Sequence, residues 1–235
     1  MRQQSFQAEE FEKYRKPTRK EIFLKDMEQI IPWKELCQVI KPYYPKPKGA
    51  GRRPIGIERM LRIHFLQHWF ALSDPAAEEA LYDSRAMRSF VGIDLGQEPV
   101  PDETTICKFR HLMERHNLGD ALFHKVNDYL AENGMKVARG TIVDATIINA
   151  PSSTKNQDKA RDPEMHQTRK GNQWYFGMKA HIGVDSKKKL IHSVVATAAN
   201  VHDSQVLEDL LHGDETRLWG DSAYSGQKET LREHA

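Results

Sequence analysis

The sequence predicts an α/β protein in which a helical first half precedes a mixed sheet. Apolar residues recur at helical spacing between about residue 57 and residue 133. From Val137 onward they follow the patterns of strands. The second half then has the element order β, β, β, α, β, α, which is typical of a sheet that combines hairpins with a helical crossover. The 235 residues also exceed one average domain of roughly 100–200 residues, so we expect two parts.

The first 50 residues are expected to form a basic arm and a linker. Residues 1–70 carry 15 Lys and Arg against 8 Asp and Glu, whereas residues 71–150 carry 8 against 13. The segment 41–54, KPYYPKPKGAGRRP, is rich in proline and glycine, which deny regular structure. A basic first part suggests that the chain holds a polyanion. An unevenly charged, solvated surface explains the same count equally well.

Residues 51–135 are expected to form a helical domain. An apolar stripe that starts at Ile57 indicates the first helix, and Asp74 is the expected N-cap of the second, followed by a first-turn proline. Asp102 is expected to cap the third helix. The fourth is expected to run from about Gly119 to Asn133, where a glycine follows.

One face of the third helix carries polar side chains suited to DNA. With the shorter helix expected around residues 86–91, this helix resembles a helix-turn-helix. The connecting turn is longer than the usual ~3–4 residues, and any solvated helix shows a polar face, so both interpretations stay open. The side chains expected to reach one DNA groove are Thr104, Lys108, His111 and Arg115.

The second half is expected to build a mixed sheet. A lysine-rich turn at residues 186–189 predicts a hairpin between its second and third strands. A helix from about Asp203 to Leu211, capped at its start by Asp203, leads to the fourth strand, and a further helix follows Ser225. Parallel pairing of the first and fourth strands would place Asp144 beside Asp221. The expected strands are 141–148, 175–184, 190–198 and 217–220.

Asp144 and Asp221 are the most informative residues of the chain. Each lies in or just beyond an apolar run that predicts a buried strand, where an unpaired charge is unfavourable. A divalent metal shared between the two carboxylates would compensate both charges and supply phosphoryl-transfer chemistry. Carboxylates are hard oxygen ligands, and no cluster of His and Cys competes for a softer metal. Capping or ion pairing of the two side chains is the alternative.

A polar, basic segment at residues 151–172 separates the first two strands. It is long for a hairpin loop, which usually has ~2–5 residues, and it is too polar to build a core. We expect an arm that contacts a nucleic-acid backbone, with Trp174 stacking on a base. An insertion without function and a tryptophan packed under the loop are the alternatives. The basic residues of this arm are Lys155, Lys159, Arg161, Arg169 and Lys170.

Cysteine content and hydropathy indicate the compartment. Cys37 and Cys107 are the two cysteines, which gives neither a disulfide framework nor a zinc-binding pair. The N-terminus lacks the apolar stretch of a signal peptide, and charges interrupt the later apolar runs. A cytoplasmic protein with no membrane partner is expected.

Six motifs occur along the chain: GRRPIGIERMLRIHFLQHW, PDETTICKFRH, VDATIINAPSSTK, DPEMHQTRKGNQWYFGMKAHIGVD, TAANVHD and WGDSAYSG. Together they resemble the DDE transposases of bacterial insertion sequences, in the branch of insertion sequence family five. The resemblance extends over most of the chain, and the combination is much more specific than any one motif.

The resemblance implies an all-α DNA-binding domain followed by a ribonuclease H-like catalytic domain at residues 136–235. The family's first two acidic ligands map onto Asp144 and Asp221, which would bind two Mg²⁺ or Mn²⁺ ions during strand cleavage and transfer. The implied partner is double-stranded DNA, as terminal inverted repeats and as target, with the protein acting as a homodimer or a larger assembly. Asn200, His202 and Asp203 match a family motif whose polar groups lie near the metal site.

The resemblance is incomplete at the C-terminus. The family's third carboxylate is a glutamate on a helix well downstream of the second aspartate, whereas this sequence ends at Ala235, 14 residues after Asp221. Glu229 and Glu233 follow too closely to be that residue. The last strand and the glutamate-bearing helix are therefore expected to be missing from the sheet. The alternatives to an active transposase are a truncated, inactive fragment that binds DNA or partner chains, and a host nuclease.

Overall fold

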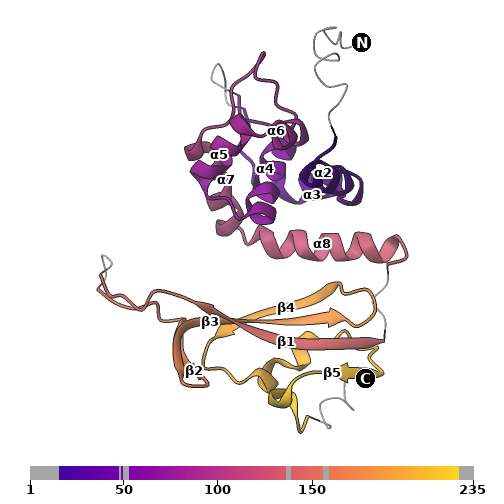
Figure 1. Ribbon diagram of the computed structural model, residues 1–235, viewed down its shortest axis with the longest axis vertical. Coiled ribbons are helices and arrows are strands. Elements are labelled where there is room, and N and C mark those ends of the chain that lie inside the picture. The colour runs from indigo at the N-terminus through magenta and orange to yellow at the C-terminus, as the bar shows by residue number, and fades with distance from the viewer. Residues whose placement is uncertain (1–15, 48, 50–52, 136–138, 156–158, 228–235) are drawn as a thin grey trace. The chain divides into compact units, whose positions relative to one another are not determined.

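The computed structural model of the chain describes residues 16–47, 49, 53–135, 139–155 and 159–227 (Figure 1). It divides into two compact units, Met1–Tyr129 and Leu130–Ala235. In the described residues the first unit is helical and the second contains a mixed sheet. The α/β class predicted from the sequence is confirmed.

The helical unit begins earlier than the sequence analysis predicts. Residues 19–40 form two helices, and Leu24, Trp33, Leu36 and Ile40 from these helices are buried in the same core as the later helices. The expectation of an arm up to residue 50 is therefore wrong for this segment. The helices are α2 (Arg19–Ile30), α3 (Trp33–Ile40), α4 (Ile57–Phe70), α5 (Asp74–Asp83), α6 (Arg85–Val91), α7 (Glu103–Arg115) and α8 (Leu118–Glu132).

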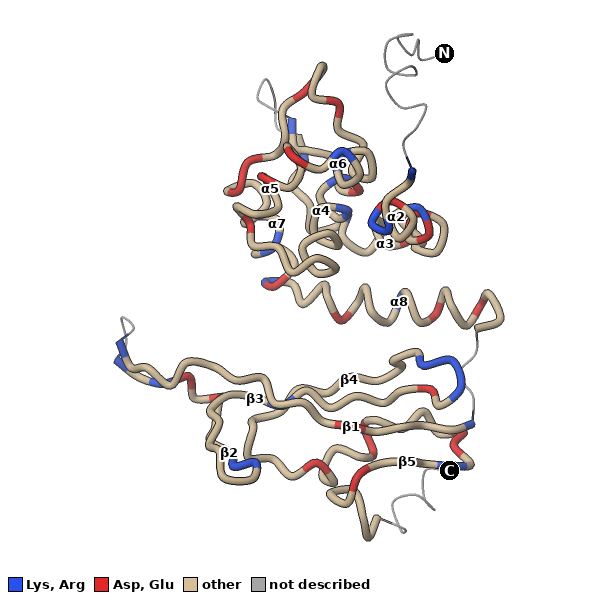
Figure 2. The backbone as a smooth tube through the Cα atoms, in the orientation of Figure 1, with Lys and Arg blue, Asp and Glu red and all other residues tan. Residues whose placement is uncertain are grey.

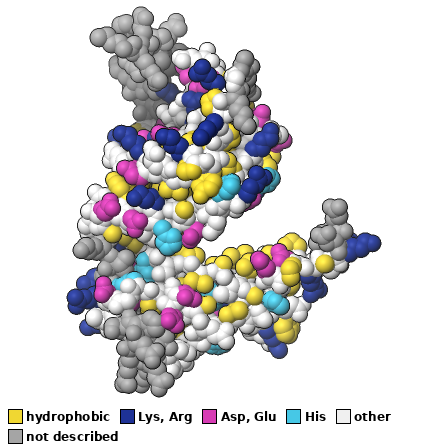
Figure 3. All heavy atoms as spheres, turned by 180° about the vertical axis from the view of Figure 1, so that it is seen from behind, with side chains coloured by type: hydrophobic (Ala, Val, Ile, Leu, Met, Phe, Trp, Pro, Cys, Tyr) yellow, Lys and Arg dark blue, Asp and Glu magenta, His cyan; other side chains and the backbone are white. Residues whose placement is uncertain are grey.

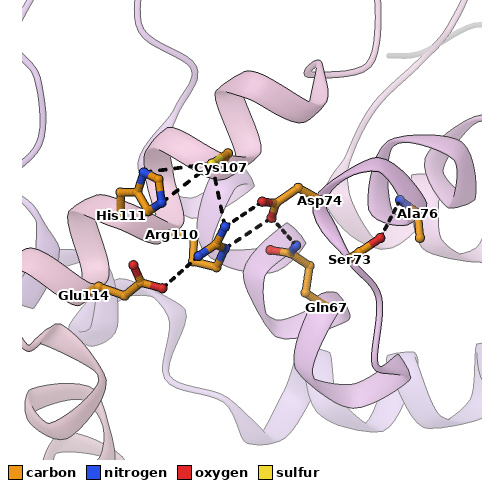
Figure 4. Close-up of polar contacts among 8 residues, drawn as sticks. All are labelled: Gln67, Ser73, Asp74, Ala76, Cys107, Arg110, His111 and Glu114. Carbon is orange, nitrogen blue, oxygen red and sulfur yellow. Dashed lines mark hydrogen bonds and ion pairs between the residues drawn. The ribbon is translucent and has the colours of Figure 1, made fainter. Parts of the chain in front are cut away.

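Two of the expected helix caps are tested by the structure. Asp102 caps α7 as predicted, because its carboxylate accepts a hydrogen bond from the Thr105 N–H at 2.7 Å. The N-cap of α5 is Ser73 and not Asp74. The Asp74 carboxylate instead accepts hydrogen bonds from Arg110 of α7 and from Gln67 of α4, each at 2.8 Å (Figure 4). Asp74 therefore joins three helices.

The sheet consists of five strands in the described residues. They are β1 (Gly140–Asn149), β2 (His166–Lys170), β3 (Gln173–Asp185), β4 (Ile191–Ala198) and β5 (Arg217–Trp219). The strand order is β2-β3-β1-β5, and β4 also pairs with β3. β3 runs antiparallel to β1, β2 and β4, whereas β5 runs parallel to β1. The predicted pairing of the first and fourth strands is confirmed.

Strand β2 was not expected, because residues 151–172 were predicted to be a polar arm between the first two strands. His166–Lys170 pairs with the start of β3 through a tight turn at Gly171 and Asn172. Gly171 has a φ of 62°, which glycine adopts without strain in a two-residue hairpin turn. The end of the arm is therefore a hairpin, and backbone pairing compensates for its polar sequence.

The two faces of the sheet differ. Val143 of β1 is buried with Val206, Leu207, Leu210 and Tyr224 in a second hydrophobic core. The opposite face, which we call the open face, carries Asp144 and the exposed Ile148, Val194 and Trp219, as the strand registers show. Hydrophobic side chains are visible at the surface of this unit in Figure 3.

The crossover from β4 to β5 is not the single α-helix that was predicted. It consists of two 3₁₀ helices, η1 (Asp203–Val206) and η2 (Glu208–Leu210), and a third, η3 (Ser222–Tyr224), follows β5. Three residues per turn place Leu207 and Leu210 on one side, and both side chains are fully buried. The last residues of the helix expected after Ser225 lie outside the described part of the chain.

Candidate functional site

Asp144 and Asp221 lie at corresponding positions of two parallel strands. β1 and β5 pair in the register of Gly140 with Arg217 and of Ile142 with Trp219. Ile142 and Trp219 are the last residues of this pairing, and Asp144 and Asp221 each lie two residues after them. The backbone of Asp221 is extended. Because side chains alternate along a strand, the Asp144 carboxylate projects from the open face, and Asp221 lies just beyond the end of β5.

Close packing on the opposite face keeps these strands together. A Cβ atom at Gly220 would lie 2.9 Å from Cγ2 of Val143 and 3.1 Å from Cδ2 of Tyr224. Both neighbours are buried, so they have little freedom to move. The absence of a side chain at residue 220 therefore allows the segment before Asp221 to pack directly against β1.

A buried carboxylate holds the loop before β5 against β1. Glu215 accepts hydrogen bonds from the Thr141 hydroxyl at 3.1 Å and from the N–H groups of His212 and Gly213 at 2.7 and 2.8 Å. Although burial opposes it, these backbone hydrogen bonds and the nearby His212 hold the pKa of Glu215 below its usual value. The residue is thus ionised at neutral pH and anchors the strand that leads to Asp221.

The two aspartates are suited to bind a divalent cation. Both are exposed, so the expectation that their strands bury them is wrong. Asp144 accepts the N–H of Ala145 at 2.8 Å, and Asp221 accepts the N–H of Ala223 at 2.9 Å. No described lysine or arginine forms an ion pair with either carboxylate. Hard oxygen atoms therefore remain open to a cation.

The described residues do not contain a complete metal cage. No group of three or more His, Cys, Asp and Glu side chains among them is arranged to hold an ion. The arrangement thus fits a site with two protein carboxylates and further ligands from water or substrate, which is how Mg²⁺ is commonly held.

Asp203 forms a part-buried ion pair with Lys179. Its Oδ1 lies 2.8 Å from Nζ of Lys179, which also donates to the carbonyl of Val201 at 2.8 Å. The N-cap of η1 is His202, whose Nδ1 accepts from the Ser204 N–H at 3.4 Å, so the prediction that Asp203 caps this segment is wrong. Asn200 is exposed in the turn after β4.

The four polar residues predicted on the third helix share one face of α7. Thr104, Lys108, His111 and Arg115 are all exposed, opposite the buried Ile106, Phe109 and Met113. Thr104 donates to Asp102 at 2.8 Å, and His111 contacts Cys107 at 3.8 Å. Figure 4 shows Cys107, Arg110, His111 and Glu114 along this helix. The face is thus accessible, and its DNA-binding role stays a prediction.

The basic residues of the arm are also exposed. Arg169 lies 6.0 Å from the ring of Trp174, which is 64% exposed, so the alternative of a tryptophan packed under the loop is wrong. Arg161 donates to the carbonyl of Ser152 and lies 5.3 Å from the Phe176 ring. Lys155, Lys159 and Lys170 are exposed. Figure 2 shows the Lys and Arg of this segment, and a second basic group at the turn between β3 and β4.

The sequence analysis did not identify Lys179 and His181, which both lie close to Asp203. Lys179 and His181 interrupt the apolar pattern of β3, and they project to the same face as Val143 because the register pairs His181 with Ala145. A charged residue and a histidine on the core face of a strand were the available signal.

Two family models match the chain. Residues 10–112 match the model of a transposase domain (DUF772), and residues 135–235 match that of a transposase DDE domain. No solved structure matches the chain. Among the described residues, no helix combines the length and the apolar character needed to span a bilayer.

Proposed function

Because the chain belongs to the DDE transposases of insertion sequences, we propose that it binds the ends of such an element and catalyses metal-dependent DNA strand cleavage and transfer. The observation that supports the proposal is the parallel register of β1 and β5, because Asp144 and Asp221 each follow the last pair of this register by two residues and both are exposed. The motifs quoted above support the branch of insertion sequence family five.

We further propose that the sheet unit is ribonuclease H-like. Strands β4, β3 and β1 are antiparallel neighbours, and β5 returns parallel to β1 after a crossover. This order supports the proposal, as does the position of the acidic residues on β1 and directly after β5.

The proposed cofactor is Mg²⁺ or Mn²⁺, bound as two ions by Asp144 and Asp221. When bound, the ions would activate the attacking hydroxyl and stabilise the leaving oxygen at phosphorus. The chain itself holds the two carboxylates in register through the parallel strands and the anchor at Glu215. No described lysine or arginine forms an ion pair with either aspartate, because Lys179 binds Asp203.

The proposed DNA contacts lie on α7 and on the arm. Lys108 and Arg115 of α7 are exposed, as are the basic residues of the arm, and each group would contact phosphates from its own unit. Trp174 is an exposed aromatic surface for an unpaired base. A homodimer on the two inverted repeats would match the two ends of an element.

A binding protein without catalytic activity is the second candidate function. The observation in its favour is that the described residues contain no group of three or more His, Cys, Asp and Glu side chains that could hold a metal ion. Such a chain would occupy the ends of the element and inhibit transposition by an active copy.

One incubation separates these functions. Purified protein is mixed with Mg²⁺ or Mn²⁺ and with DNA that carries the ends of the element, and in parallel with DNA of scrambled ends. The proposal predicts retardation and nicking at the ends. Retardation without any nick would support the binding protein, and nicking that ignores the terminal sequence would support a nuclease.

A further inference from the structure

Two histidines on consecutive turns of α4 bring their imidazole rings together. His64 and His68 are four residues apart, so they lie on the same face of this helix. Their Nε2 atoms are 3.1 Å apart. Nδ1 of His64 is buried and has no hydrogen-bond partner among the described residues, so Nε2 is the nitrogen through which this ring can meet a ligand. His68 is exposed, which gives solvent access to the pair.

The geometry of the two rings is poor for a hydrogen bond between them. Their planes are 88° apart, and their centroids are 4.5 Å apart. A straight N–H···N bond of this length would place the centroids about 5.4 Å apart, so a hydrogen bond between these rings is bent. Two imidazoles that share one ion, with metal–nitrogen bonds of roughly 2.0–2.1 Å, would have their centroids about 4.8 Å apart at the same nitrogen separation. The observed distance is closer to that of a pair of metal ligands.

The surroundings of the two rings favour a cation. His68 lies in the last turn of α4, where the helix dipole is negative. Both rings line a recess of about 330 Å³ together with Asp74 and Arg110. Arg110 is paired with two carboxylates, that of Asp74 at 2.8 Å and that of Glu114 at 2.9 Å (Figure 4). These three side chains together carry a net negative charge, so the arginine does not repel a bound ion on balance.

His64 is neutral at physiological pH. Burial, and then the charges of His68 and Arg110, lower its pKa to about 4, against the opposing effect of Glu114 and Asp74. A neutral imidazole is the form that offers a nitrogen lone pair to a metal.

We propose that His64 and His68 form a binding site for a transition-metal ion such as Zn²⁺, with water completing the coordination. The same spacing of two histidines on one helix face binds zinc in H-E-x-x-H motifs. Imidazole nitrogen suits Zn²⁺, Cu²⁺ and Ni²⁺, whereas carboxylates suit Mg²⁺, so this ion differs in kind from the one proposed for Asp144 and Asp221. The site does not rest on the proposed function.

The ion has two protein ligands and open positions. No third His, Cys, Asp or Glu in the described part of the chain is arranged to join the pair. A bound ion would link the last two turns of α4 to each other and would thereby stabilise the folded helical unit.

Zn²⁺ binding to the full-length protein, purified without a histidine tag, tests the proposal. Isothermal titration calorimetry compares the wild type with His68→Gln, a change at an exposed position that should leave the fold intact. Loss of a residue that only supports a metal ligand weakens metal binding by roughly 10–100-fold, so loss of a ligand should weaken Zn²⁺ binding at least tenfold. Equal Zn²⁺ affinity of the two proteins would overturn the proposal, as would a wild type that does not bind Zn²⁺.

His116→Gln is the matched control. His116 is also exposed in the helical unit, but its ring lies against that of Tyr43, with centroids 4.5 Å apart, so this variant should bind Zn²⁺ like the wild type. Zn²⁺ binding that fell as much in His116→Gln as in His68→Gln would contradict a site at the histidine pair of α4.

His111→Gln tests the other candidate pair of ligands in this unit. Sγ of Cys107 lies 3.8 Å from Nε2 of His111, one turn further along α7. The proposal predicts that His111→Gln keeps the Zn²⁺ affinity of the wild type. Loss of binding in His111→Gln but not in His68→Gln would assign the ion to α7 and overturn the proposal.

Discussion

At the scale of single residues, Asp144 is the side chain on which the proposed chemistry depends. Asn at this position keeps the shape but removes the charge that attracts a divalent cation. Asp144→Asn should therefore lose nicking of end-bearing DNA by at least a hundredfold while it retards the same DNA as well as the wild type. The exposed Asp209, on η2, provides the control, since Asp209→Asn should nick normally. Wild-type nicking by Asp144→Asn would remove this residue from the site.

His64 makes the stability of the helical unit depend on pH. Burial is the largest cause that lowers its pKa to about 4, with further lowering by His68 and Arg110 and opposition from Glu114 and Asp74. In the unfolded chain His64 binds a proton near pH 6.5, whereas in the folded chain it does not. The contribution of neutral His64 to stability is therefore fully present above pH 6.5 and is lost as the pH falls toward 4. The loss is at most on the order of 3 kcal/mol.

Urea denaturation between pH 7 and pH 4 measures this effect. The free energy of unfolding of the helical unit should change less between pH 7 and pH 4 in His64→Gln than in the wild type. This difference in pH dependence is expected whatever the stability of the variant at pH 7. If the free energy of unfolding fell equally with pH in the two proteins, His64 would be protonated in the folded state as readily as in the unfolded chain.

At the scale of elements, the junction of β1 with β3 depends on Gly177. Its φ is 152°, and a Cβ atom there would lie 2.0 Å from the carbonyl oxygen of Ile148, which is backbone and cannot rotate away. Gly177→Ala should therefore destabilise the sheet unit by more than about 2 kcal/mol.

Gly171→Ala is the matched comparison for this junction. Gly171 also has a positive φ but has open space around it, so the change should destabilise the unit by only about 1 kcal/mol. Urea denaturation followed by circular dichroism compares the two variants. Equal losses would contradict the steric argument.

The polar face of α7 is the element expected to hold DNA. Lys108→Ala and Arg115→Ala should each weaken retardation of end-bearing DNA and reduce the slope of log affinity against log salt by about one. Lys34→Ala, on the exposed side of α3, controls for the loss of one positive charge. If Lys34→Ala weakened DNA retardation as much as Lys108→Ala, the net charge of the protein would explain the loss and the α7 face would not.

At the scale of the whole molecule, the sequence predicted what local patterns determine. The change from helical to extended periodicity predicted the helical and sheet parts, and the crossover before the fourth strand predicted that Asp144 and Asp221 are neighbours. The sequence did not predict the partner of Asp203. Lys179 is 24 residues away from Asp203 along the chain, and only the pairing of β3 with β4 brings the two side chains close. Strand β2 was missed since its residues, HQTRK, lack an apolar pattern.

The start of the helical unit was missed for a related reason. The positive charge of the first 70 residues suggested an arm, but Leu24, Leu36 and Ile40 are spaced to face a core, and helices α4 to α7 supply it. A capping box further stabilises the start of helix α2. The Thr18 N–H donates to the Glu21 carboxylate at 2.8 Å, and the Glu21 N–H donates to the Thr18 hydroxyl at 3.2 Å.

The most direct test of a cation held jointly by Asp144 and Asp221 is a Mn²⁺ titration of four proteins: the wild type, Asp144→Asn, Asp221→Asn and the double variant. Two carboxylates that share an ion act as a unit, so either single change should remove as much binding as both together. Each single variant should lose at least tenfold in Mn²⁺ affinity, with no further loss in the double variant. Wild-type affinity in either single variant would contradict the shared site.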